Sequence, residues 1–174
     1  MKSCTAILAF VLCMCAQSEA QIVPQPIMSF EKLAWGDSLG YVKRQLADKP
    51  SDGVPETSNS EHIRTYSFRD TINSHQIGVS LMFADDGRRL SAAAIFYFGR
   101  TASSEPSDSI RSRRVDDMWD FLVSHFGPLH TNKRTNAFGE TITWHFGRTT
   151  VLMTKTRQGG SLLSLMYNGP LGVK

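Results

Sequence analysis

The stretch 76–98, QIGVSLMFADDGRRLSAAAIFYF, contains two apolar runs separated by DDG at positions 85–87. In the first run the large apolar side chains occupy alternate positions, as in a strand with one buried face. These side chains are Ile77, Val79, Leu81 and Phe83. In the second run, 90–98, positions of both parities are apolar, which is typical of a strand at the centre of a sheet. The stretch therefore predicts a β-hairpin whose second arm is a central strand.

Apolar residues at helical spacing predict two helices, one on each side of this hairpin. The first is expected over 39–49, with Asp37 or Ser38 as its N-terminal cap. The second is expected to end at Gly127, because glycine readily takes the left-handed conformation past a last helical turn. The apolar faces of the two helices are Leu39, Val42 and Leu46, and Val115, Met118, Trp119, Leu122 and Phe126.

Further short apolar runs predict strands at 63–68, 142–146, 151–153 and 163–167. Each half of the chain then contains one helix followed by three strands. The expected fold class is α+β, a two-layer arrangement in which two helices pack on one face of an antiparallel sheet. The halves, 30–100 and 106–170, form a possible tandem αβββ-αβββ pseudo-repeat within a single domain, 21–174.

The first twenty residues have the composition of a cleavable secretory signal peptide. A short basic start is followed by an apolar run and by small residues before Ala20, so cleavage is expected after Ala20. The apolar run is too short to cross a membrane, and no transmembrane segment is expected elsewhere. The cysteines all lie in this segment, at Cys4, Cys13 and Cys15. A cysteine-free exported chain favours the bacterial periplasm, or secretion, as the location.

The composition argues against one class of partner, nucleic acid. The 19 basic and 16 acidic residues give a net charge of +3. A charge this small provides no electrostatic reason to expect nucleic acid. The expected partner is another exported or envelope protein.

No set of residues in the sequence has the spacing of a catalytic or metal site. The histidines lack the close pairs that zinc sites commonly use. The acidic doublets at 85–86 and 116–117 are explained by a turn and by a first helical turn. We therefore predict no catalytic residues, no metal ligands and no cofactor.

Seven residues are candidates for binding, because arginine recognises anionic groups and tryptophan often anchors interfaces. They are Trp35, Arg88, Arg89, Arg100, Arg111, Arg113 and Arg114. The arginines would form one cluster if the hairpin and the second helix were neighbours. The alternative is a solvated face on which these arginines pair with nearby aspartates. For Trp35 the alternative is a packing role at the entry to the first helix.

Two short motifs are similar to those of small exported bacterial modules. Trp35-Gly36-Asp37-Ser38 resembles their W-G-x-S helix opening, and Phe126-Gly127-Pro128 resembles their helix exit. The families concerned are those of beta-lactamase inhibitor protein and of the small lipoprotein of the barrel assembly machinery. The resemblance implies a non-enzymatic module that presents its sheet or its loops to another protein.

These observations favour an exported, non-catalytic binding module of unknown partner. One alternative is a hydrolase, or a hydrolase inhibitor, whose residues come from separate loops. A second alternative is an envelope-associated protein that binds anionic surfaces through the arginines.

Overall fold

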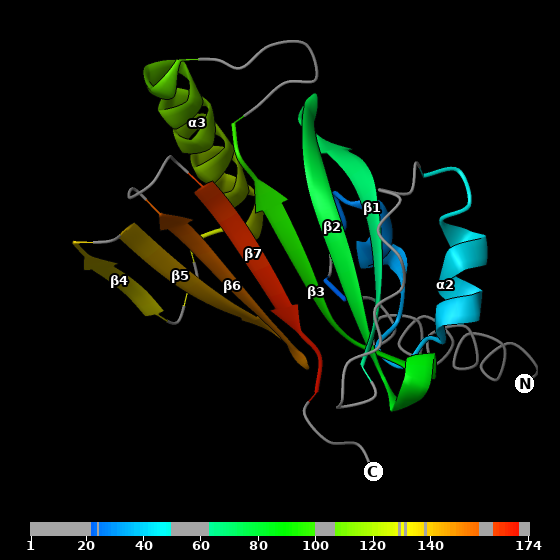
Figure 1. The fold of residues 1–174 in the computed structure, drawn as a ribbon. Coiled ribbons are helices and arrows are strands. Elements are labelled where there is room, and N and C mark those ends of the chain that lie inside the picture. The colour runs from blue at the N-terminus through cyan, green and yellow to red at the C-terminus, as the bar shows by residue number, and fades with distance from the viewer. Residues whose placement is uncertain are drawn as a thin grey trace, which may run out of the picture.

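The computed structural model describes residues 22–23, 25–49, 63–99, 107–128, 130, 132–137, 139–156 and 162–170. Along the chain (Figure 1) lie η1 (Ser29–Lys32), α2 (Leu39–Gln45), β1 (Arg64–Ile72), β2 (His75–Ala84), η2 (Asp85–Gly87), β3 (Arg89–Tyr97), α3 (Asp108–Phe126), β4 (Asn132–Asn136), β5 (Gly139–Phe146), β6 (Thr149–Thr156) and β7 (Leu162–Asn168). The predicted signal peptide, 1–20, and Arg100 lie outside the described residues.

The strands form one seven-stranded sheet in the order β1-β2-β3-β7-β6-β5-β4. Every neighbouring pair is antiparallel. The predicted α+β class and the antiparallel sheet are therefore confirmed. Strand β3 lies in the interior of the sheet between β2 and β7, as its apolar sequence predicts.

The central hairpin forms with the predicted strands. Val79 lies opposite Ile95 and Leu81 lies opposite Ala93, so the large apolar side chains of both arms share one face. A β-bulge at Met82/Phe83 shifts the register close to the turn.

The second half contains four strands and not the three expected. The additional strand, β4, has the sequence NKRTN, and all five residues are exposed. Within the described sheet it pairs only with β5 and lies at one edge, opposite β1 at the other edge (Figure 1). A polar edge strand has no apolar alternation, so the pattern that identifies the other strands is absent here.

Helix α2 begins at the predicted residue, Leu39, but it ends at Gln45 and not at position 49, whereas α3 ends where its sequence predicts. Of the two proposed caps for α2, Ser38 is the one used, since its Oγ accepts a hydrogen bond from the Tyr41 N–H at 3.3 Å. The carboxylate of Asp37 instead accepts from the Ala34 N–H at 2.8 Å. Helix α3 ends at Gly127, whose φ of 83° lies in the left-handed region.

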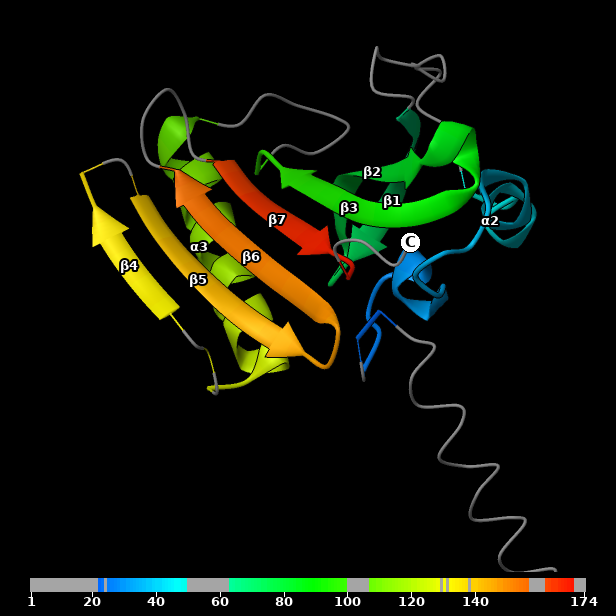
Figure 2. The same cartoon turned by 90° about the horizontal axis from the view of Figure 1, so that it is seen from below.

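Alternate residues of every strand except β4 form a buried face, which we call the covered face. Phe126 of α3 packs there against Trp144, Phe146 and Tyr167, with ring centroids 5.3, 5.8 and 6.4 Å away. Figure 2 shows α3 behind β5, β6 and β7, whereas α2 lies beside β1. In α2, the Lys43 ammonium lies 5.8 Å from the ring centre of Tyr66 on β1.

The segment before α2 contributes to the core. Ile22 and Val23 are buried, although the prolines around them suggest an extended tail. Phe30 of η1 packs edge-on against the Tyr167 ring at 5.2 Å. This segment therefore belongs to the layer on the covered face.

A buried carboxylate fixes this segment. Glu31 is fully buried, and its Oε2 accepts hydrogen bonds from the Ile27 and Met28 N–H groups at 2.7 and 2.9 Å. The Tyr167 hydroxyl donates to Oε1 at 2.6 Å. Burial raises the pKa of Glu31, and these hydrogen bonds oppose that change only in part. Burial and the adjacent carboxylate also raise the pKa of Tyr167 well above its usual value.

We expect Tyr167→Phe to lower the free energy of unfolding by about 1–3 kcal/mol near neutral pH, because Glu31 loses a donor while it stays buried. The raised pKa means that the stability contributed by Glu31 is fully present below pH 4.5, its ordinary value, and is lost as pH rises through the folded-state pKa. The variant raises that pKa further, so its deficit should shrink as the pH falls toward 4.5.

Urea unfolding at about pH 7 and about pH 5 measures this change. Tyr66→Phe is the control, since it removes a hydroxyl from a half-buried ring of the same face. An equal deficit for Tyr167→Phe at both pH values would show that the hydroxyl does not act through the charge of Glu31.

Candidate functional site

The second face of the sheet is the main candidate site, and we call it the open face. It consists of the odd-numbered residues of β1 and β5, the even-numbered residues of β2, β4, β6 and β7, and Arg89, Ala92, Ala94 and Phe96 of β3. Apart from Ala94 and Gly139, all of these residues are half-buried or exposed. The open face is therefore accessible across the described part of the sheet.

Hydroxyl side chains dominate the open face and bond across strands. Ser67 and Ser80 lie 2.9 Å apart, and Thr141 and Thr154 lie 3.3 Å apart. His145 bonds to Thr150 at 3.1 Å. Such cross-strand pairs hold the surface side chains in place, so the face is pre-organised for contact.

Apolar groups lie in the middle of this hydroxyl surface. Phe96 is 39% exposed and Leu152 is 36% exposed. Met166 lies between Ala94 and Leu152 in the strand register. The sequence analysis does not identify these residues as a site, and for Phe96 the apolar residues of both parities in 90–98 indicate only a central strand.

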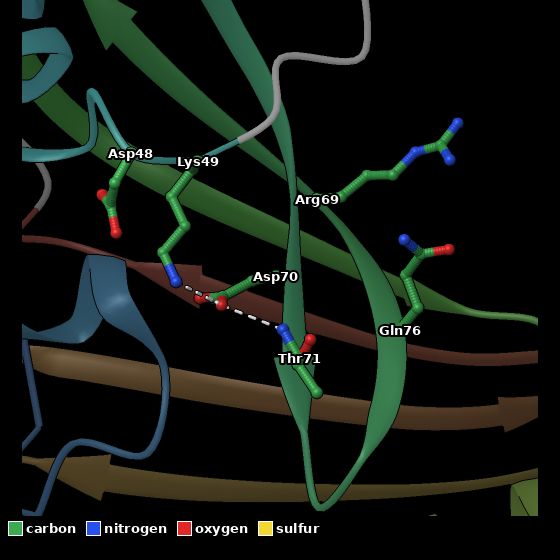
Figure 3. Close-up of a pocket in the computed structure, with 6 residues that line it drawn as sticks. All are labelled: Asp48, Lys49, Arg69, Asp70, Thr71 and Gln76. Carbon is green, nitrogen blue, oxygen red and sulfur yellow. Dashed lines mark hydrogen bonds and ion pairs between the residues drawn. The ribbon is translucent and has the colours of Figure 1, made fainter.

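A shallow hollow of about 180 Å³ lies at the β1–β2 edge of the sheet and includes residues of both faces (Figure 3). It is lined by Asp48, Lys49, Arg69, Asp70, Thr71 and Gln76. Figure 3 shows Lys49 directed toward Asp70, whereas Arg69 and Gln76 point away from that pair. The hollow is smaller than the roughly 300–1,000 Å³ of most ligand pockets.

The carboxylate in this hollow has a structural environment. Asp70 Oδ1 accepts from Lys49 Nζ and from the Thr71 N–H, both at 2.9 Å, and Oδ2 accepts from the Ser29 N–H at 3.0 Å. Burial by itself would raise the pKa of Asp70, but these donors outweigh it and hold that pKa below its usual value. An ionised, fully bonded carboxylate is a poor acid or base, and here it fastens η1 to β1.

The predicted arginine cluster is divided between the two ends of β3. Arg88 and Arg89 follow η2 at the start of β3, where Arg89 pairs with Asp85 at 2.6 Å. Arg114 lies past the other end of β3 and donates to the Gly99 carbonyl at 3.4 Å. An extended strand of this length separates its ends by roughly 27 Å. The structure therefore does not bring these arginines together.

The remaining arginines of that prediction lie on α3 or outside the described residues. Arg111 pairs with Asp108 at 3.0 Å, as the alternative of internal pairing expects. Arg113 is exposed on the same helix. Arg100 is outside the described residues.

Trp35 is half-buried, and its indole N–H donates to Thr149 Oγ1 at 2.7 Å. A Cβ atom placed on Gly169 would lie 2.7 Å from the Trp35 ring, so the ring packs directly on that backbone. These contacts connect the entry of α2 to β6 and to the end of β7. They are the contacts of a packing residue, the second of the two roles considered for Trp35.

The described residues contain no group of three or more histidine, cysteine, aspartate or glutamate side chains arranged to hold a metal ion. No helix among them is long and apolar enough to cross a membrane.

Lys155, which sequence reasoning missed, lies on the covered face, where it pairs with Asp116 at 2.8 Å and approaches the Trp119 ring at 4.9 Å. Its position within an alternating apolar strand is the signal that could have identified it.

We expect Lys49→Met to lower the free energy of unfolding by about 1–2 kcal/mol near neutral pH, because Asp70 loses its ammonium partner while it stays buried. The lowered pKa of Asp70 means that its stabilisation is present above pH 3.8, the ordinary value, and is lost as pH falls through the folded-state pKa. The difference between wild type and variant should therefore narrow in acid. Urea unfolding measures it, with the exposed Lys32→Met as control. A difference that is constant down to about pH 3 would contradict this account.

Comparison with known proteins adds little to this geometry. No model of a protein family matches the chain. No curated protein sequence matches it either. Among solved structures, the chain is similar to a DUF4309 family protein, YjgB, from Bacillus subtilis, with a TM-score of 0.42 and 16% sequence identity over 76% of this chain and 78% of that one.

Proposed function

We propose that this chain is an exported, non-catalytic module that binds another protein of the cell envelope or secreted space. The observation that carries the proposal is the difference between the two faces of the sheet. The covered face contains the core. The open face presents hydroxyl and apolar side chains to the surroundings.

The buried ionisable groups support the absence of catalysis in this proposal. Glu31, Asp70 and Lys155 are each engaged by at least two groups of neighbouring elements or backbone. Catalytic groups need a pKa near the working pH and access to a substrate. All three groups lie instead on the covered face, where they hold other elements against the sheet.

The proposal includes the finer architecture. Both helices form one layer on the covered face, and α2 with β1–β3 and α3 with β5–β7 are two related units. The contacts of Lys43 with Tyr66 and of Phe126 with Tyr167 support the single layer. A layer on one face alone leaves the other face of both units available to the same partner.

We expect the full-length chain, tagged at its C-terminus and cross-linked in the cells that produce it, to capture one dominant envelope or secreted protein. Mass spectrometry of the mature chain should show Gln21 at its N-terminus, which tests export separately. A chain defective in folding, Phe126→Asp, is the control for non-specific capture. Turnover of an envelope substrate that one substitution on the open face abolishes would refute the non-catalytic assignment.

A further inference from the structure

We infer that the open face binds an acidic protein surface, with Phe96 and Leu152 as the apolar centre of the contact and arginines at its margin. This inference rests on the proposed function and names the chemistry of the partner. Its first basis is the charge of the face. Its second basis is the arrangement of those charges across the sheet.

Every charged strand residue of the open face is basic. Arg69, Arg89 and Arg134 belong to it, and none of its described strand residues is an aspartate or a glutamate. The acidic strand residues Asp70 and Glu140 lie on the covered face, where each has a lysine within 4 Å. Asp85, in the turn, pairs with Arg89 at one end of the open face. The described strand residues of the open face therefore carry positive charges and no negative charge, while the overall charge of the chain is small.

Two of these arginines end a single cross-strand row. Arg69 lies on the edge strand β1, and Arg134 lies on the edge strand β4. The register places Gly78, Phe96, Ser164, Thr154 and Thr141 between them, in that order. Six strand spacings separate the two guanidinium-bearing positions by roughly 29 Å. A partner that engages both must present a broad surface with carboxylates toward its margins.

Apolar groups lie in the middle of the open face, within and beside this row, as the centre of an interface requires. Phe96 faces Gly78 on one side, so no side chain covers its ring from that neighbour. Leu152 lies next to Met166 one row away. The strands span a face of roughly 700 Å². That area is close to the ~800 Å² that each partner contributes to a standard protein interface.

The same charges disfavour two other occupants. A second copy docked face to face would bring arginine-bearing margins together, and like charges in contact are unfavourable. An anionic membrane is usually recognised by clusters of about four to eight basic residues. Three arginines dispersed around a hydroxyl-rich surface do not form such a cluster. A folded acidic protein fits the face best.

The test uses a photo-cross-linking residue placed at position 152 of the full chain, in the cells that produce it. The matched control carries the same residue at position 110 on α3, where Ile110 is 48% exposed. We expect one protein to be captured from position 152 and not from position 110. That protein is then purified, and its affinity for the full chain is measured at low and high salt.

We expect Phe96→Ala to weaken this affinity about tenfold or more, as for an apolar anchor. The double variant Arg69→Ala/Arg134→Ala should weaken it about 3–10-fold at low salt and reduce its salt dependence. Arg113 is an exposed arginine on α3, and Arg113→Ala should leave the affinity and its salt dependence unchanged. Circular dichroism and urea unfolding establish that each variant is folded.

Four results would overturn the inference. The first is cross-linking from position 110 alone or from neither position, and the second is capture of a second copy of this chain. The third is binding that neither salt nor the arginine substitutions affect. The fourth is stronger binding to phosphatidylglycerol vesicles than to any protein. A partner that binds the chain but is insensitive to the open-face variants would leave the proposed function standing and remove only this inference. Failure to capture any partner with the chemically cross-linked full chain would remove both.

Discussion

The pairing of β3 with β7 is the constraint on which the rest of the structure depends. Among the described strands it is the single pairing between β1–β3 and the second half, and it pairs residues as distant in sequence as Ala93 and Tyr167. Because side chains alternate along a strand, a slip of one residue here would move the apolar side chains of a whole half to the other face. The register instead aligns Ile95 with Leu165 and then with Met153, so one continuous core crosses both halves.

Other elements cover this continuous core, and two buried carboxylates attach one of them, η1, to the sheet. Glu31 connects η1 to β7 through Tyr167, and Asp70 connects the same 3-10 helix to β1 through the Ser29 N–H. The two acids respond to burial with opposite pKa changes, because Asp70 has a lysine partner and Glu31 has only neutral donors. Protonation of the buried Glu31 in mild acid therefore favours folding, although its hydrogen bond from Tyr167 is strongest when the carboxylate is ionised. The attachment of η1 to β1 through Asp70 also needs an ionised carboxylate.

Much of this fold could be predicted from apolar periodicity, because the covered face imposes that periodicity on every element that contacts it. The hairpin β2–β3, helix α3 and strands β5–β7 all carry it. Strand β4 could not be predicted, since an exposed edge strand contacts no core. The candidate site could not be predicted from the arginines, because their separation depends on β3 running between them. The open face is defined by the strand register, which places Arg69 and Arg134 at the ends of the row that contains Phe96.

The two faces of the sheet contribute unequally to folding. Folding free energy comes mainly from apolar area removed from water, and that area lies on the covered face. Open-face side chains contribute less to the folding free energy, so their identity is less constrained by the fold. An apolar residue such as Phe96 gains little stability at 39% exposure, and its ring becomes fully buried only when another surface covers it. The hydroxyl groups on the same face make cross-strand hydrogen bonds, so the face is ordered in the chain by itself.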